Sequence, residues 1–172
     1  IPDDIVVVGP NVIDGDGNRQ SPLKEPSFLE ECTNPFIATI KKKLSNNLIC
    51  HVESIKSDEP YKVKKVSGAC LMIRTSFLKE IGLLDENVFL YCEEPILMYQ
   101  VQKHKGTIIF LPFVTVKHLH HARKENIFQY KEFMKSRLYF LSRYKKYTFW
   151  QIVLIKASYS LVLLIKIFKF MR

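Results

Sequence analysis

The C-terminal part of the chain constrains the fold most, because neither glycine nor proline occurs after Pro112. These are the two residues that most often end a helix or form a turn. Residues 123–172 carry 12 Lys and Arg against 2 Asp and Glu, and the stretch from Phe149 to Ile165 is strongly apolar. We therefore predict that residues from 125 onward form a basic, apolar helical tail.

The apolar part of this tail is expected to contact a membrane. Its uncharged run Ala157–Ile165 is too short to cross about 30 Å of hydrocarbon. A longer span from Thr148 to Ile165 would place Lys156 near the middle of the bilayer, where a charge is costly. A helix lying in the interface lets its lysines reach the headgroups. Interfacial contact is the first expectation, a marginal span and packing in a homodimer are the alternatives, and nucleic acid is a poor fit.

Residues 1–122 are close to neutral, with 14 Lys and Arg against 15 Asp and Glu. The chain is 47% hydrophobic, so this segment can bury a core. Its four cysteines form no C-x-x-C pair, which argues against zinc fingers and a disulfide framework and favours a reducing compartment. Ile1–Ile5 has no basic, signal-like character, and the chain begins without Met, so we expect further sequence upstream. We predict two domains, residues 1–122 and 123–172.

Apolar runs separated by turn residues predict an α/β fold for the first domain. The strands at 66–74 and 107–117 are expected to be neighbours in one sheet. The excursion between residues 19 and 62 is rich in proline and predicted to be irregular. The expected elements are a strand at 5–8 that stops at Gly9-Pro10, a turn at 14–17, short helices at 27–31 and 35–44, a strand at 66–74, a helix capped by Thr75 or Ser76 that ends at Gly82, a helix at 95–103 and a strand at 107–116.

Four short motifs occur in order along this domain. They are Ser67-Gly68-Ala69, then Gly82-Leu83-Leu84-Asp85-Glu86, then Phe89-Leu90-Tyr91-Cys92-Glu93-Glu94, and finally an apolar strand ending at His118. Their order and spacing resemble the C-terminal half of family 2 glycosyltransferases of the rhamnosyltransferase-like kind, over roughly residues 4–145. The resemblance implies a partial GT-A (Rossmann-like) mixed sheet, followed here by the helical tail.

The resemblance also implies a reaction. Family 2 enzymes of this kind transfer a sugar, with inversion, from a nucleotide-sugar to a glycan or lipid-linked acceptor in surface polysaccharide synthesis. The acceptor hydroxyl must lose a proton to a base, and the departing diphosphate needs positive charge beside it. The resemblance makes Glu94 the base and gives acceptor contacts to Glu93, Gly68 and Ala69. It makes His118 a ligand of a divalent metal, Mg or Mn.

Taken alone, the same residues allow plainer interpretations. Two carboxylates at a helix start interact favourably with the helix dipole, and small residues such as Gly68 can serve packing only. His118, His120 and His121 could form a solvated cluster. The sequence also departs from the family pattern: Glu94 replaces the usual Asp, and Ile96 and Gln100 stand where an acidic residue and an Arg are usual.

The family's donor-binding half, with its Asp-x-Asp metal motif, is expected upstream of Ile1. We therefore expect this chain alone to bind a nucleotide-sugar poorly. The alternative function is a non-catalytic or split transferase half that binds a glycan or a partner chain at a membrane. In both cases the expected location is the cytoplasmic, inner face of the cell membrane.

Overall fold

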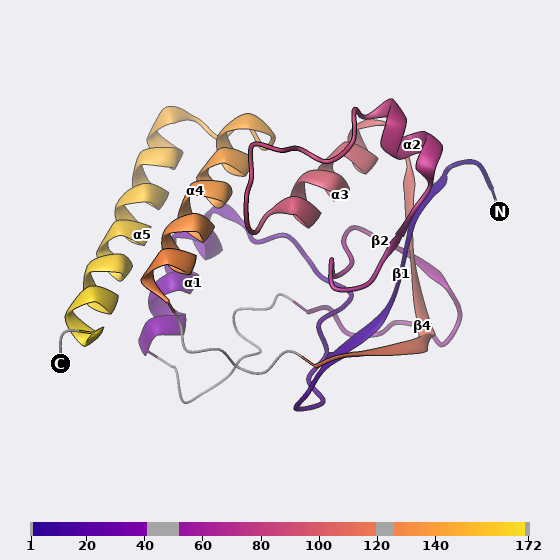
Figure 1. The fold of residues 1–172 in the computed structure, drawn as a ribbon, viewed down its shortest axis with the longest axis horizontal. Helices are drawn as coiled ribbons and strands as arrows, with labels where there is room; N and C mark the ends of the chain where they lie inside the picture. The colour runs from indigo at the N-terminus through magenta and orange to yellow at the C-terminus, as the bar shows by residue number, and fades with distance from the viewer. Residues whose placement is uncertain (1, 41–51, 120–125, 171–172) are drawn as a thin grey trace. The chain divides into compact units, whose positions relative to one another are not determined.

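The computed structural model describes residues 2–40, 52–119 and 126–170, which form a four-stranded mixed sheet and helices (Figure 1). The predicted α/β class, mixed sheet and helical tail are therefore confirmed. Two compact units are formed, each from several segments of the chain. The elements are β1 (Ile5–Asp14), α1 (Phe28–Ile40), β2 (Tyr61–Val63), β3 (Met72–Ile73), α2 (Thr75–Glu80), α3 (Glu93–Lys103), β4 (Thr107–His118), α4 (Ile127–Arg143) and α5 (Phe149–Phe170).

The sheet belongs to the first unit, which comprises Ile1–Glu25, Cys50–Asp85 and Glu93–Ala122. Its strand order is β2-β4-β1-β3. The long strands β1 and β4 run parallel at its centre, and the short strands β2 and β3 pair antiparallel at the two edges. The expected strands at 66–74 and 107–117 thus do lie in one sheet, but they are not neighbours, because β1 lies between them.

Strand β1 is longer than predicted, because it does not stop at Gly9-Pro10 but continues to Asp14. Pro10 cannot donate a backbone hydrogen bond, and the pairing with β4 shifts register immediately after it, from Pro10↔Leu111 to Asn11↔Thr115. Three residues of β4, starting at Pro112, fall inside that shift. The two prolines therefore create a bulge in the centre of the sheet rather than ending either strand.

The predicted strand at 66–74 shrinks to β3, the two residues Met72 and Ile73. Val66 leaves the sheet plane and packs on Gly9 of β1, where an added Cβ would come within 2.7 Å of the Val66 Cβ. Residues 68 and 69 form a turn. The apolar run is thus explained by burial of Val66 in the core and not by strand pairing, which periodicity alone does not distinguish.

Helices α2 and α3 complete the first unit. Arg74, not Thr75 or Ser76, is the N-cap of α2, and no side chain caps it, while Gly82 follows its end with φ +82° as expected. Helix α3 begins two residues before the predicted start at Pro95 and ends at Lys103 as predicted. The core of this unit consists of Val6, Val7, Val66, Phe77, Leu97, Met98, Val101, Ile108 and Phe110.

The second unit comprises Pro26–Ile49, Glu86–Cys92 and Arg123–Arg172. The first two of these segments were predicted to belong to the domain of residues 1–122. The second unit therefore contains more of the chain than the predicted domain of residues 123–172. Helix α5 packs against both α1 and α4. Helix α1 is one continuous helix through Pro35, not the two short helices expected at 27–31 and 35–44. Residues 41–44 lie outside the described residues.

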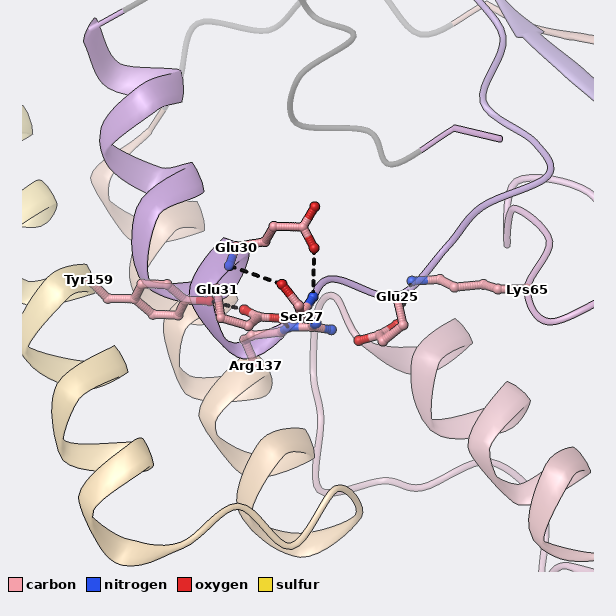
Figure 2. A network of polar contacts seen from close by, with 7 residues as sticks. All are labelled: Glu25, Ser27, Glu30, Glu31, Lys65, Arg137 and Tyr159. Carbon is pink, nitrogen blue, oxygen red and sulfur yellow. Dashed lines mark hydrogen bonds and ion pairs between the residues drawn. The ribbon is translucent and has the colours of Figure 1, made fainter. Parts of the chain in front are cut away.

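Reciprocal side-chain caps set the starts of α1 and α5. The Ser27 hydroxyl accepts from the Glu30 N–H, and the Glu30 carboxylate accepts from the Ser27 N–H, which is a capping box (Figure 2). Thr148 and Gln151 make the equivalent pair before α5. The connection between α4 and α5, residues 144–148, contains neither glycine nor proline. Within it, Lys146 adopts the positive backbone angle φ +53°.

A buried ion pair lies at the centre of the second unit (Figure 2). The Arg137 guanidinium on α4 donates to the Glu31 carboxylate on α1, with its Nε atom 3.0 Å from Oε1. The Tyr159 hydroxyl on α5 donates to the other carboxylate oxygen over 2.7 Å. All three side chains are buried. Desolvation and the neighbouring Glu31 charge raise the pKa of Tyr159, so it stays protonated and keeps its proton donated.

Candidate functional site

Glu94 is the second residue of α3, so the carboxylate lies in the first helical turn as the sequence predicts. It is half-buried. Among the residues that the structure describes, none donates a hydrogen bond or an ion pair to Glu93 or Glu94. A half-buried carboxylate with no protein donor is in a suitable state to accept a proton from a ligand. The expected opening of Glu94 into a cleft stays a prediction.

Gly68 and Glu94 are in direct contact. A Cβ atom added at Gly68 would come within 2.6 Å of Oε1 and 2.7 Å of Cδ of Glu94. Both values are shorter than real Cβ contacts, so glycine is the residue that leaves room for this carboxylate. The structure therefore brings together two of the predicted site residues, which are distant in sequence.

The backbone just before α3 is strained. Tyr91 has φ +68° and Cys92 has φ +69°, values that non-glycine residues rarely adopt. Each such residue costs on the order of 1–3 kcal/mol and persists where its surroundings impose it. The Cys92 side chain is buried, which holds this conformation in place. The two strained residues fix the direction in which the chain enters Glu93 and Glu94.

The turn that carries Gly68 and Ala69 is held by hydroxyl groups. The Ala69 N–H donates to Ser67 Oγ over 3.3 Å, and the Ser67 N–H donates to Ser21 Oγ over 3.4 Å. Ser21 and Ser67 are buried, while Gly68 and Ala69 are exposed. The two small residues therefore form an exposed backbone surface beside the Glu94 carboxylate.

His118 ends β4 and lies opposite Asp14, the last residue of β1. Its Nδ1 atom is 3.0 Å from the Oε1 atom of Gln20. If Nδ1 carries the proton in this contact, Nε2 is the ring atom that holds the lone pair. His120 and His121, the other members of the predicted cluster, lie outside the described residues.

Among the residues that the structure describes, those around His118 do not complete a metal site. Asp14 already accepts hydrogen bonds from the N–H groups of Asp16 and Asn18 and from the Asn18 amide. Desolvation raises the pKa of Asp14, but these donors lower it by more. The Asp14 carboxylate is therefore used to accept the hydrogen bonds of the turn. No group of three His, Cys, Asp or Glu residues suited to a metal is found in the described ranges. His118 would be one ligand at most.

Gln20 and Ser21 connect the two parts of the site. The Gln20 side chain contacts His118, and the Ser21 hydroxyl accepts from Ser67, beside Gly68. The Gln20 N–H also donates to the Val12 carbonyl of β1 over 2.7 Å. Sequence reasoning missed both residues because it treated residues 19–62 as an irregular excursion. The hairpin turn at Asp14–Gly17 was the signal that the chain returns along β1.

Besides Glu94 itself, the two other departures from the family pattern also lie on α3. Ile96 is buried among the apolar residues of that helix, so this position contributes to the core and not to an exposed surface. Gln100 is half-buried on the same helix. Neither position carries the charged side chain that is usual in the pattern that the sequence resembles.

Helix α5 has the length and composition of a membrane-crossing segment over Phe149–Phe168. Its sequence contains Lys156, Lys166 and Lys169 and no acidic residue. The cysteines Cys32, Cys70 and Cys92 are free thiols, and Cys50 lies outside the described residues.

No protein-family model, curated protein or solved structure matches this chain in the comparisons. The contacts around Glu94, Gly68 and His118 are therefore the basis for a functional proposal.

Proposed function

We propose that this chain is the acceptor-side half of an inverting glycosyltransferase with a GT-A-like fold, of the family 2 kind. Such an enzyme transfers a sugar from a nucleotide-sugar to a glycan or lipid-linked acceptor. The observation that carries the proposal is the contact of Gly68 with Glu94. It leaves a half-buried carboxylate at a helix start, without a protein donor among the described residues, next to an exposed turn of small residues.

In this proposal the acceptor sugar lies over Gly68 and Ala69, where the absence of large side chains permits close approach. Its nucleophilic hydroxyl donates to Glu94, which takes the proton as the hydroxyl oxygen attacks the anomeric carbon. Glu93 contacts the acceptor from the preceding position. The nucleotide-sugar and its diphosphate would be bound by a donor half outside this chain.

A divalent metal, Mg or Mn, remains part of the proposal for the complete enzyme. Of the described residues, this chain would offer it His118, whose Nδ1 atom contacts Gln20. The metal would supply positive charge at the departing diphosphate. We further propose that the enzyme works at the cytoplasmic, inner face of the cell membrane, with α5 as the membrane-contacting element.

The proposal is tested with the natural protein that contains this chain, incubated with a panel of nucleotide-sugars and oligosaccharide or lipid-linked acceptors. We expect release of a nucleoside diphosphate that depends on both substrates. If no pair of donor and acceptor reacts, the proposed transferase activity is contradicted.

The second candidate function is a non-catalytic half that binds a glycan or a partner chain. The burial of Ile96 favours it, because an acceptor contact usual in the family is replaced there by a core residue. The same assay separates the two functions. Binding of an oligosaccharide, measured by saturation-transfer NMR, without any nucleoside diphosphate release would support the binding module.

A further inference from the structure

Helix α5 has an apolar face that no described residue covers. The side chains on this face recur at spacings of three, four and seven residues, which places them along one side of a helix. All of them are exposed, from 38% for Val153 to 72% for Trp150. We call this set the α5 stripe: Trp150, Val153, Leu154, Ala157, Leu161, Leu164 and Phe168. It runs about 27 Å along the helix, at 1.5 Å per residue.

The opposite side of α5 is buried against other helices of the second unit. Ile155, Tyr159 and Val162 are fully buried and share a face, and α5 contacts both α1 and α4. The helix is therefore apolar on two sides. Only one of them is explained by packing within the second unit.

Polar contacts fix α5 beside its neighbours. The Tyr159 hydroxyl donates to Glu31 of α1 (Figure 2). The Ser158 hydroxyl donates to the Cys32 carbonyl of α1 over 2.6 Å. Glu31 is itself paired with Arg137 of α4. If α5 crossed a bilayer, Lys156 would have to enter hydrocarbon. The buried ion pair would have to enter hydrocarbon as well or lose its contact with α5. Either outcome is costly, so the geometry favours a helix that lies along a surface.

The positive charge around the α5 stripe indicates what kind of surface the stripe would contact. Residues 123–172 carry 12 Lys and Arg against 2 Asp and Glu. Exposed Arg143 and Lys146 precede the stripe, and Lys156 is exposed within its length. A second copy of this chain would bring the same positive charge to the contact, and the two would repel. An anionic lipid surface is complementary to both the charge and the apolar stripe.

We propose that the α5 stripe inserts into the headgroup–acyl boundary of an anionic bilayer, with the helix axis parallel to the membrane and its buried face still packed on α1 and α4. Lys156 and Lys146 then reach the headgroups with their flexible stems. This inference rests on the membrane contact in the proposed function and not on its transfer chemistry. Absence of vesicle binding would therefore remove the membrane contact and leave the transfer chemistry standing, and the reverse also holds.

Vesicle binding of the full chain tests the stripe. Trp150 is the only tryptophan, so its blue shift reports insertion directly. We expect binding to phosphatidylcholine–phosphatidylglycerol vesicles at low salt. Leu161→Ser/Leu164→Ser, at positions 50% and 51% exposed, should weaken binding on the order of 100-fold while far-UV circular dichroism stays unchanged. The matched control is Leu83→Ser/Leu84→Ser in the first unit, at 58% and 48% exposure, which should bind as the wild type does.

The charges are tested separately. Lys146→Gln and Lys156→Gln should each weaken binding about fivefold at low salt, and the difference should shrink as salt rises. Pure phosphatidylcholine vesicles should bind weakly and without this dependence. Equal binding to neutral and anionic vesicles would contradict the role of the basic residues.

The orientation is tested by depth-dependent quenching with brominated lipids. The wild type reports the depth of position 150, and Trp150→Phe/Leu161→Trp reports the middle of α5. Equal, shallow quenching at both positions supports a helix parallel to the surface. Deep quenching at 161 with shallow quenching at 150 would mean a membrane span and overturn the proposal. Absence of vesicle binding would also overturn it, and a dimer that dissociates in Leu161→Ser/Leu164→Ser would then identify the stripe as a contact between copies.

Discussion

Gly68 lies so close to Glu94 that a Cβ atom added at Gly68 would come within 2.6 Å of the Glu94 Oε1 atom. The two residues belong to different elements, a turn after Val66 and the first turn of α3. This contact sets the position of the only proposed general base in the site. The methyl group that a Gly68→Ala substitution adds would therefore test the position of that carboxylate.

Gly68→Ala should displace the Glu94 carboxylate without unfolding the protein, because Gly68 is exposed and the contacting atoms belong to a flexible side chain. In the natural protein, we expect transfer to fall by about 10²-fold, the scale expected for a 1 Å misplacement. The matched control is Gly15→Ala, where an added Cβ meets nothing within 4 Å. An unchanged rate in Gly68→Ala, with Gly15→Ala also unchanged, would remove Gly68 from the site.

Glu31→Gln should destabilise the second unit strongly, because it removes the carboxylate charge that pairs with the buried Arg137 guanidinium. Breaking a buried pair in this way costs about 3–5 kcal/mol. Tyr159→Phe removes one hydrogen bond to the charged group and should cost about 1.5–3 kcal/mol. Urea unfolding followed by circular dichroism measures both. Since the two side chains share one contact, the double variant should lose less than the sum; strict additivity would show that they do not interact.

Asn18→Ala should raise the pKa of Asp14 toward its ordinary value, because it removes the amide donor of the turn and leaves the backbone donors in place. The folded-state pKa of Asp14 is lowered, so the stability that it contributes is present above the unfolded-state value of about 3.9. That contribution is lost as pH falls through the folded-state pKa. The variant should therefore be less stable than the wild type at neutral pH, with the difference vanishing in acid. An NMR titration that finds the Asp14 pKa unchanged would exclude this role for Asn18.

The sequence predicted the elements whose signals are local. The helix at Glu93–Lys103, the turn at Asp14–Gly17 and the helical character after residue 125 follow from periodicity, turn residues and the absence of glycine and proline. The break between α4 and α5 was missed, although Thr148 and Gln151 have the spacing of a capping box. That signal was readable in the sequence.

Prolines were the main source of error in the predicted fold. Pro10 was interpreted as part of the turn that ends a strand, and Pro35 as the start of a second helix, but β1 and α1 continue through them. At Pro10 the register shift against β4 accommodates the missing donor. At Pro35 the helix is held by its packing on α5, where Ser158 donates to the Cys32 carbonyl. Tertiary contacts of this kind cannot be read from a local pattern.

The same limit applies to the candidate site. Glu93, Glu94, Gly68, Ala69 and His118 could be selected from motifs, but Gln20 and Ser21, which hold His118 and Ser67, could not. The partners of Glu31 lie 106 and 128 positions away in sequence, so nothing near Glu31 predicts that this carboxylate is buried. Long-range polar contacts are specified by the complete fold.

The rate of sugar transfer by Glu94→Gln in the natural protein that contains this chain tests the central claim most directly. The substitution keeps the shape of the side chain and removes its basicity. We predict a fall of about 10²–10⁴-fold in kcat, with acceptor binding and urea stability close to those of the wild type. A Glu94→Gln enzyme that turns over at a near wild-type rate would contradict the assignment of Glu94 as the base.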